Sequence, residues 1–380
     1  MTRFGSTNGL VSPKTSSPDI RRDDGTSIKP GPPYKLQFKQ RRQLTETVMR
    51  RMMNRTVMFQ FNQTGTSHTP SQNSSRAPDL AVSLNGPYLA AELTIAFLST
   101  VGNLLVCAAV GLNRKLQTVT NYFLVSLAVA DICVGAVAIP CAILTDAGLP
   151  RHSFYPCLLM LSLLIMFTQS SIFSLLAVAV ERYVAIFMPF RYQVLMTSCN
   201  ALMVILTTWL LAFLIGLVPL MGWHKTPPDS GYCFFVSVVD MTYMVYFNFF
   251  ACVLAPLVIM FVIYARIFVE VKRQLRRIKS EQSGRAEGRM HREIKTATTL
   301  FLVLFLFTVC WIPLHIINCF LLLCPHCAVP LELLLTAIIL SHANSAVNPF
   351  LYAFTMAPFK ETFKTMFLCC RTAAARDAGQ

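Results

Sequence analysis

The chain has 380 residues, of which 54% are hydrophobic and only 13% are charged, about half the charged share of a soluble domain. This composition excludes a soluble protein, and for most of the chain it excludes disorder as well. The net charge of +15 divides into +8 before residue 87 and +7 after it. A basic chain can bind nucleic acid, but here the charge lies in a tail and between apolar runs. We therefore expect an integral membrane protein without a nucleic-acid partner.

Residues 1–87 are rich in Ser, Thr, Asn, Pro and Arg, and no apolar stretch among them could serve as a signal peptide. We expect a disordered extracellular tail. A cluster of methionines ends at Met53, and we hypothesise that the working protein starts there and that residues 1–52 are dispensable. Three N-glycosylation sequons follow the cluster, beginning at Asn54, Asn62 and Asn73.

From residue 88 onwards, long apolar runs alternate with short polar gaps. A helix needs about 20 apolar residues to cross the hydrocarbon core, and the runs lack the strict alternation of barrel strands. The pattern predicts an all-α integral membrane protein, a seven-transmembrane helix bundle over 88–356. The predicted spans are 88–111, 121–145, 157–186, 200–222, 240–268, 294–322 and 331–355.

The Lys and Arg residues of short loops indicate the orientation. The gaps after spans one, three and five carry most basic residues of the body, including ten between Arg266 and Lys295. The opposite gaps hold only Arg151 and Lys225. This asymmetry predicts that the N-terminus is extracellular. We expect a multi-pass protein of the plasma membrane.

After span seven, apolar residues recur at helical spacing beyond Pro358, with polar residues opposite them. The pattern predicts an amphipathic helix over 357–370 that lies on the inner leaflet of the lipid bilayer, followed by a short cytoplasmic tail, 371–380. Cys369 and Cys370 are candidates for palmitoylation. The apolar face comprises Phe359, Phe363, Phe367 and Leu368.

Charged side chains within a membrane are costly, so each one suggests a functional site. Glu92 lies near the outer end of span one, and Asp131 lies near the middle of span two. Closing the bundle would bring hydroxyl and amide groups to Asp131, an arrangement that suits a monovalent cation such as allosteric sodium. A polar network that joins helices is the alternative. The candidate sodium site comprises Asp131, Ser171, Asn344 and Asn348.

Pro313 interrupts span six and Pro349 interrupts span seven, which predicts kinks in these neighbouring helices and a bundle that moves. Glu181, Arg182 and Tyr183 end span three at the cytoplasmic boundary. There, Arg182 either pairs with its neighbour Glu181 or reaches a cytoplasmic partner.

Four cysteines lie on the predicted outer side, where an oxidising compartment permits disulfides. Cys157 opens span three and Cys233 lies in the second outer loop, so these two are a candidate pair. Cys324 and Cys327 in the third outer loop could form a small disulfide or contribute to a zinc site. We favour the disulfide, because two Cys and one His make an incomplete zinc site.

Together these motifs resemble the signature of rhodopsin-like G-protein-coupled receptors, in order over residues 88–370. The resemblance implies a heterotrimeric G protein and arrestin as partners. Residues implied in G-protein coupling are Glu181, Arg182, Tyr183, Tyr264 and Tyr352. The motifs are Asn103, Leu127-Ala-Val-Ala-Asp131, Cys157, Glu181-Arg182-Tyr183, Trp209, Pro256, Trp311-Ile-Pro313 and Asn348-Pro349-Phe-Leu-Tyr352.

Finer motifs resemble adenosine receptors, among them Thr168-Gln-Ser-Ser171, Gly222-Trp223 and Ser341-His342-Ala-Asn344. The resemblance implies that Asn318 hydrogen-bonds the adenine edge and that Phe235 stacks on the ring. Thr168 and His342 would hold the ribose, with Glu92 supporting His342. The other implied pocket residues are Met244, Asn248, Trp311, Leu314, His315 and Ile338.

The run from Cys233 to Val238 and the segment Phe359-Lys-Glu-Thr look most like the third adenosine subtype, which lowers cyclic AMP through inhibitory G proteins. An adenosine receptor that raises cyclic AMP through stimulatory G proteins is the alternative. Several adenosine receptors carry a Glu after the stacking Phe, where Val236 stands here. Having Val instead of Glu at this position is expected to weaken binding of the exocyclic amine of adenine and to allow bulkier substituents on that amine.

Two other classes explain the sequence less well. A nucleoside transporter would show internal repeats and chains of midplane charge, whereas the chain has an odd number of spans and one deep acid. An intramembrane enzyme would need a nucleophile beside a base or a complete metal set, and neither occurs at workable spacing. We therefore expect a receptor that is not an enzyme and has no cofactor beyond sodium.

Overall fold

The computed structural model describes residues 85–280, 284–324 and 327–366, with side chains described except at 277–293. Within these ranges, seven helical segments are long and apolar enough to cross a membrane. The predicted all-α, seven-span fold is thereby confirmed. The N-terminal tail with its sequons and the cysteine pair Cys369 and Cys370 lie outside the described residues.

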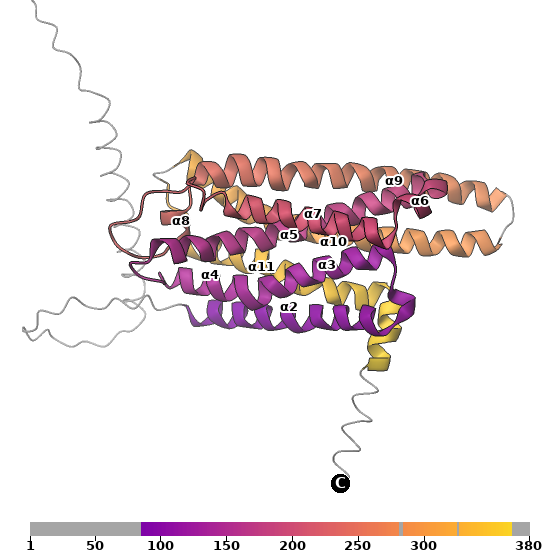
Figure 1. Cartoon of the computed structure of the whole chain (residues 1–380), viewed down its shortest axis with the longest axis horizontal. Coiled ribbons are helices and arrows are strands. Elements are labelled where there is room, and N and C mark those ends of the chain that lie inside the picture. The colour runs from indigo at the N-terminus through magenta and orange to yellow at the C-terminus, as the bar shows by residue number, and fades with distance from the viewer. Residues whose placement is uncertain (1–84, 281–283, 325–326, 367–380) are drawn as a thin grey trace, which may run out of the picture. The chain divides into compact units, whose positions relative to one another are not determined.

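Neighbouring spans lie side by side, with α5 packed against α3, α7 and α9, and α11 packed against α2 and α10 (Figure 1). The spans are α2 (Gly86–Leu112), α3 with η2 and α4 (Val119–Cys133, Val134–Ala138 and Ile139–Asp146), α5 (Phe154–Phe187), α7 (Ser198–Leu217), η3 with α9 (Tyr243–Leu254 and Ala255–Ser280), α10 (Gly284–Leu323) and α11 (Leu331–Thr355). The short elements are η1 (Arg114–Leu116), α6 (Pro189–Leu195) and α8 (Phe235–Val238).

Local sequence sets the ends of several spans. Thr118 and Thr197 precede α3 and α7, and each side-chain oxygen accepts a hydrogen bond from the backbone amide three residues later, as N-cap residues do. The fourth span ends at Leu217, earlier than the predicted residue 222. Pro219 follows and has no N–H with which to continue the helix.

Two spans contain π-helical segments that the hydrophobic pattern does not predict. η2 begins three residues after Asp131, and η3 carries Met244 and Asn248, two of the implied ligand residues. A π-turn holds more residues than an α-turn, so it changes the direction in which the following side chains point. Such turns occur often at functional sites.

Trp209 joins the fourth span to the bundle through a chain of polar contacts. Its indole Nε1 donates to the Ser126 hydroxyl at 3.0 Å, and that hydroxyl lies 3.0 Å from the Ser174 hydroxyl. The contacts link α7 to α3 and α5. In lipid, hydrogen bonds of this kind supplement close packing as the attraction between helices.

A helix over 357–366 follows span seven, as the amphipathic pattern predicts. Its rings Phe359 and Phe363 are buried, and Phe359 lies 5.7 Å from the Tyr352 ring at the inner end of α11. This part of the apolar face therefore packs on the bundle rather than facing only the inner leaflet. The polar residues Lys360, Glu361 and Lys364 are exposed.

We predict that Phe359→Ala destabilises the protein more than Phe354→Ala. The Phe359 side chain is 1% exposed and Phe354 is 78% exposed, so only the first substitution removes buried ring contacts, at a cost of about 3–5 kcal/mol. The measurement is the thermal unfolding midpoint of each purified variant in detergent. Equal midpoints for the two variants would contradict the packing described here.

Candidate functional site

The second outer loop is fastened to the outer end of the bundle. Cys233 is bonded to Cys157 in the first turn of α5, and an antiparallel bridge joins His224 to Val239. The Lys225 ammonium donates to the Val236 carbonyl at 2.8 Å. Burial lowers the pKa of Lys225, while the neighbouring Asp240 acts in the opposite direction. These contacts fix the segment that carries Phe235.

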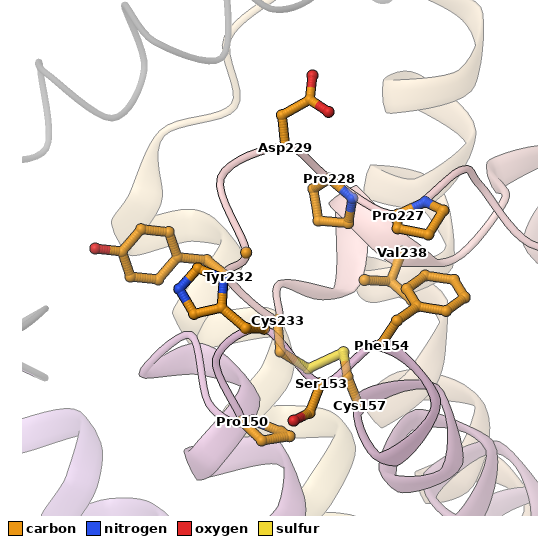
Figure 2. Close-up of a pocket in the computed structure, with 12 residues that line it drawn as sticks. Pro150, Ser153, Phe154, Cys157, Pro227, Pro228, Asp229, Tyr232, Cys233 and Val238 are labelled. Atoms are coloured by element: carbon orange, nitrogen blue, oxygen red, sulfur yellow. A yellow bond between two sulfur atoms is a disulfide. The ribbon is translucent and has the colours of Figure 1, made fainter.

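A cavity of about 220 Å³ lies between the first and second outer loops, beside the Cys157–Cys233 disulfide (Figure 2). The implied purine-binding residues are not among those that line it, so this hollow is separate from the implied nucleoside site. Its lining includes Pro150, Ser153, Phe154, Pro227, Asp229, Tyr232 and Val238.

The third outer loop contains a second disulfide. Cys324 and Cys327 are bonded to each other with three residues of sequence separation. The two sulfurs therefore form the small disulfide and not the alternative zinc site.

Two polar pairs, one buried and one part-buried, join α2 to α11 and to α4. Glu92 and His342 lie with Oε2 and Nδ1 2.7 Å apart, and both side chains are buried. The second pair was not identified from the sequence: the Tyr88 hydroxyl donates to Asp146 Oδ2 at 2.6 Å. A Tyr and an Asp at the rim of two spans give no pattern that predicts their contact.

An aromatic column descends through the middle of the bundle. His315 is 3% exposed and stacks on Phe249 with ring centroids 4.5 Å apart, while Trp311 stacks on Phe307 below it. Neither imidazole nitrogen of His315, nor Nε1 of Trp311, has a hydrogen-bond partner among the described residues. Buried polar atoms are usually satisfied, so these three atoms fit a site for a polar ligand or for water.

The remaining implied ligand residues belong to several helices and to the second outer loop. Phe235 and Met244 belong to one apolar cluster beneath the outer loop. The Thr168 hydroxyl donates to the Leu164 carbonyl of its own helix, at 2.9 Å. Asn248 and Asn318 are buried, whereas Leu314 and Ile338 are half-buried.

Asp131 is fully buried and lies in a polar network at the centre of the bundle. Its Oδ1 accepts from the Ser171 hydroxyl at 3.2 Å, and its Oδ2 accepts from the Asn348 amide at 2.8 Å. Asn344 is buried one turn before Asn348 in the same helix. The donor set of carboxylate, hydroxyl and amide oxygens suits a hard cation.

At the cytoplasmic end of α5, Arg182 is held by its neighbours. Its Nε and one terminal nitrogen donate to the two oxygens of Glu181, each at 2.6 Å, and it also donates to Thr120. The Tyr192 hydroxyl, which the sequence did not single out, donates to Glu181 at 2.5 Å. Burial raises the pKa of Tyr192 to about 12, and the hydrogen bond to Glu181 acts in the same direction. The phenol therefore keeps its proton at neutral pH.

The other residues implied in G-protein coupling have surroundings of their own. Tyr183 stacks on Phe187, with centroids 4.4 Å apart. Tyr264 and Tyr352 are buried, and the Tyr352 hydroxyl has no hydrogen-bond partner within the described part of the chain. Phe190 on α6, also on the cytoplasmic side, is 98% exposed, a feature that the sequence analysis missed.

Comparison with known proteins identifies the family. A family model described as 7 transmembrane receptor (rhodopsin family) matches residues 102–352. The chain is 47% identical to adenosine receptor A2a of Homo sapiens over 293 residues, which cover 73% of this chain and 71% of that receptor. It is also 47% identical to adenosine receptor A2b of Bos taurus over 306 residues, 75% of this chain and 91% of that receptor. The chain belongs to the adenosine receptors of the rhodopsin family.

The receptor is therefore a multi-pass protein of the plasma membrane and not an enzyme. The relatives just described are A2a and A2b receptors. They do not support the expected resemblance to the third subtype, which rested on short runs of sequence.

We predict that Glu92→Ala destabilises the receptor, because it leaves the buried His342 without its acceptor, at a cost of about 1–3 kcal/mol. Glu332→Ala is the matched control, since Glu332 is exposed in the first turn of α11. The thermal unfolding midpoint of each purified variant in detergent checks this. A midpoint for Glu92→Ala as high as that of the control would refute the role of the pair.

Proposed function

We propose that extracellular adenosine activates this receptor. The observation that carries the proposal is the identity of 47% with adenosine receptor A2a over nearly three quarters of the chain. The buried Glu92–His342 pair and the unpartnered nitrogens of His315 and Trp311 support it. They offer polar groups for a sugar and a base within an otherwise apolar bundle.

In the proposed complex, Asn318 makes two hydrogen bonds to the adenine edge and Phe235 stacks on the ring. His342, held by Glu92, and Thr168 bind the ribose hydroxyls. For Thr168 this requires its hydroxyl to turn away from the Leu164 carbonyl or to accept a hydrogen bond. The walls are Met244, Asn248, Trp311, Leu314, His315 and Ile338.

Agonist binding shifts the bundle only if the active arrangement binds adenosine more tightly. We propose that this arrangement frees Arg182 from Glu181 and Thr120 and admits a heterotrimeric G protein, with arrestin as a later partner. Phe190 on α6 offers an exposed apolar contact for the G protein. Tyr183, Tyr264 and Tyr352 line the same end of the bundle.

We propose stimulatory coupling, so that adenosine raises cyclic AMP. Inhibitory coupling was expected from the resemblance to the third subtype, and the A2a and A2b relatives remove that basis. The stimulatory alternative is the one that remains.

We also propose that sodium binds at Asp131 with Ser171, Asn344 and Asn348. These oxygen donors would hold the ion in the closed arrangement, so sodium would oppose agonist binding. Glycosylation of Asn54, Asn62 and Asn73 and palmitoylation of Cys369 and Cys370 are proposed as modifications outside the described residues.

The main test expresses the full chain in cells and applies adenosine. We predict saturable surface binding and a rise in cyclic AMP. We also predict that Asn318→Ala lowers adenosine affinity by about tenfold or more, because buried polar groups lose their partner. Asn200→Ala, on the cytoplasmic side, is the control. A fall in cyclic AMP would assign inhibitory coupling, and uptake of radiolabelled adenosine without a second-messenger change would indicate a transporter.

For the sodium site, we predict that adding sodium lowers agonist affinity of the natural receptor by about fivefold or more, the usual scale of coupling between sites. Asp131→Asn should abolish most of this effect, because it removes the charge that the ion needs. The measurement is agonist displacement of a radiolabelled antagonist in membranes, with choline replacing sodium as the control. Full sodium sensitivity in Asp131→Asn would refute the proposal.

A further inference from the structure

We infer that the outer ends of spans one and two form an acidic subsite that binds a cationic group carried by the nucleoside ligand. The inference rests on the proposed function and extends it to the chemistry of the ligand. It concerns four side chains: Tyr88 and Glu92 on α2, Asp146 at the end of α4, and His342 on α11.

The four groups form one electrostatic cluster. Within it are the two hydrogen-bonded pairs already described, Tyr88 with Asp146 at 2.6 Å and Glu92 with His342 at 2.7 Å. The pairs also act on each other, since Asp146 interacts with both Glu92 and His342 and Tyr88 interacts with Glu92. Asp146 therefore lies within electrostatic range of the pair that we assign to the ribose.

The cluster contains more acidic groups than basic groups. It contains two carboxyl groups and one imidazole, so ionised acids leave at least one negative charge uncompensated even when His342 is protonated. Glu92 is fully buried, and its second oxygen, Oε1, has no hydrogen-bond partner among the residues that the structure describes. A buried carboxylate oxygen without a hydrogen-bond partner is costly. A cation in contact with this oxygen would reduce that cost.

A ligand ammonium fits the cluster better than a metal ion. Among the described residues, no group of three or more His, Cys, Asp and Glu side chains is placed to hold a metal. Asp146 is only half-buried at the outer end of α4, so part of this residue is open to solvent. The Tyr88 hydroxyl binds its Oδ2 and leaves Oδ1 to accept a charge-assisted hydrogen bond from an amine.

The test uses two pairs of adenosine derivatives, one substituted at purine C2 and one at the ribose 5′ carbon. In each pair, one member carries a short aminoalkyl chain and the other a hydroxyalkyl chain of equal length. Affinities come from displacement of a radiolabelled antagonist in membranes that hold the full chain. In one of the two series, we expect the amine to bind about tenfold more tightly than its alcohol, a difference typical of a charge-assisted hydrogen bond.

Variants of Asp146 test whether this residue causes the preference for the amine over the alcohol. Asp146→Asn should abolish it while leaving adenosine affinity within about twofold, and Asp146→Glu should retain it because the charge remains. Asp229→Asn removes an exposed acid of the second outer loop and is the matched control. It should retain the full preference. Asp146→Ala serves as the informative variant if Asp146→Asn fails to reach the membrane, and it should likewise abolish the preference because it removes the charge.

Equal affinities for amine and alcohol in both series would overturn the subsite, as would an undiminished preference in Asp146→Asn. Either result would leave adenosine binding intact and so would not affect the proposed function. Failure of adenosine itself to displace the antagonist would instead overturn the proposed function.

Discussion

A polar group buried in lipid must find its partner within the protein, and the centre of this receptor is organised around one such group, Asp131. Its carboxylate joins span two to spans three and seven through Ser171 and Asn348. Its backbone carbonyl accepts from Ser99, and Asn103 bonds to the carbonyls of Ser99 and Ser345, which adds span one. Four spans thus meet in one network, and a change at any of its members alters how they pack.

Buried glutamates occupy the two ends of the bundle in comparable ways. Glu92 is paired with His342 at the outer end, and Glu181 is paired with Arg182 at the cytoplasmic end. Each acid holds a side chain for which we propose a binding role: Glu92 orients His342 for the ligand, and Glu181 holds Arg182 until the G protein binds. The aromatic column of His315, Trp311 and Phe307 lies between these ends and has few polar contacts of its own.

The spans and their order were predictable, because a helix in lipid satisfies its own backbone and its residues must be apolar for about 20 positions. The π-helical turns in η2 and η3 were not, since they change the backbone without changing the apolar pattern. The contacts Tyr88–Asp146 and Tyr192–Glu181 depend on which helix ends meet, and sequence spacing does not encode this. Likewise, periodicity identified the apolar face with Phe359 and Phe363 but not the surface that covers it.

The packing of Phe359 against Tyr352 has a mechanical consequence. Pro349 lies inside α11 three residues before Tyr352, and a proline favours bending at such a point, so a swing of the inner segment of span seven would carry the helix over 357–366 with it. That helix carries the exposed lysines Lys360 and Lys364, which anionic lipid headgroups would attract. Lipid bound there would act on the same equilibrium as the ligand, and by reciprocity an agonist would change how strongly the receptor binds those lipids.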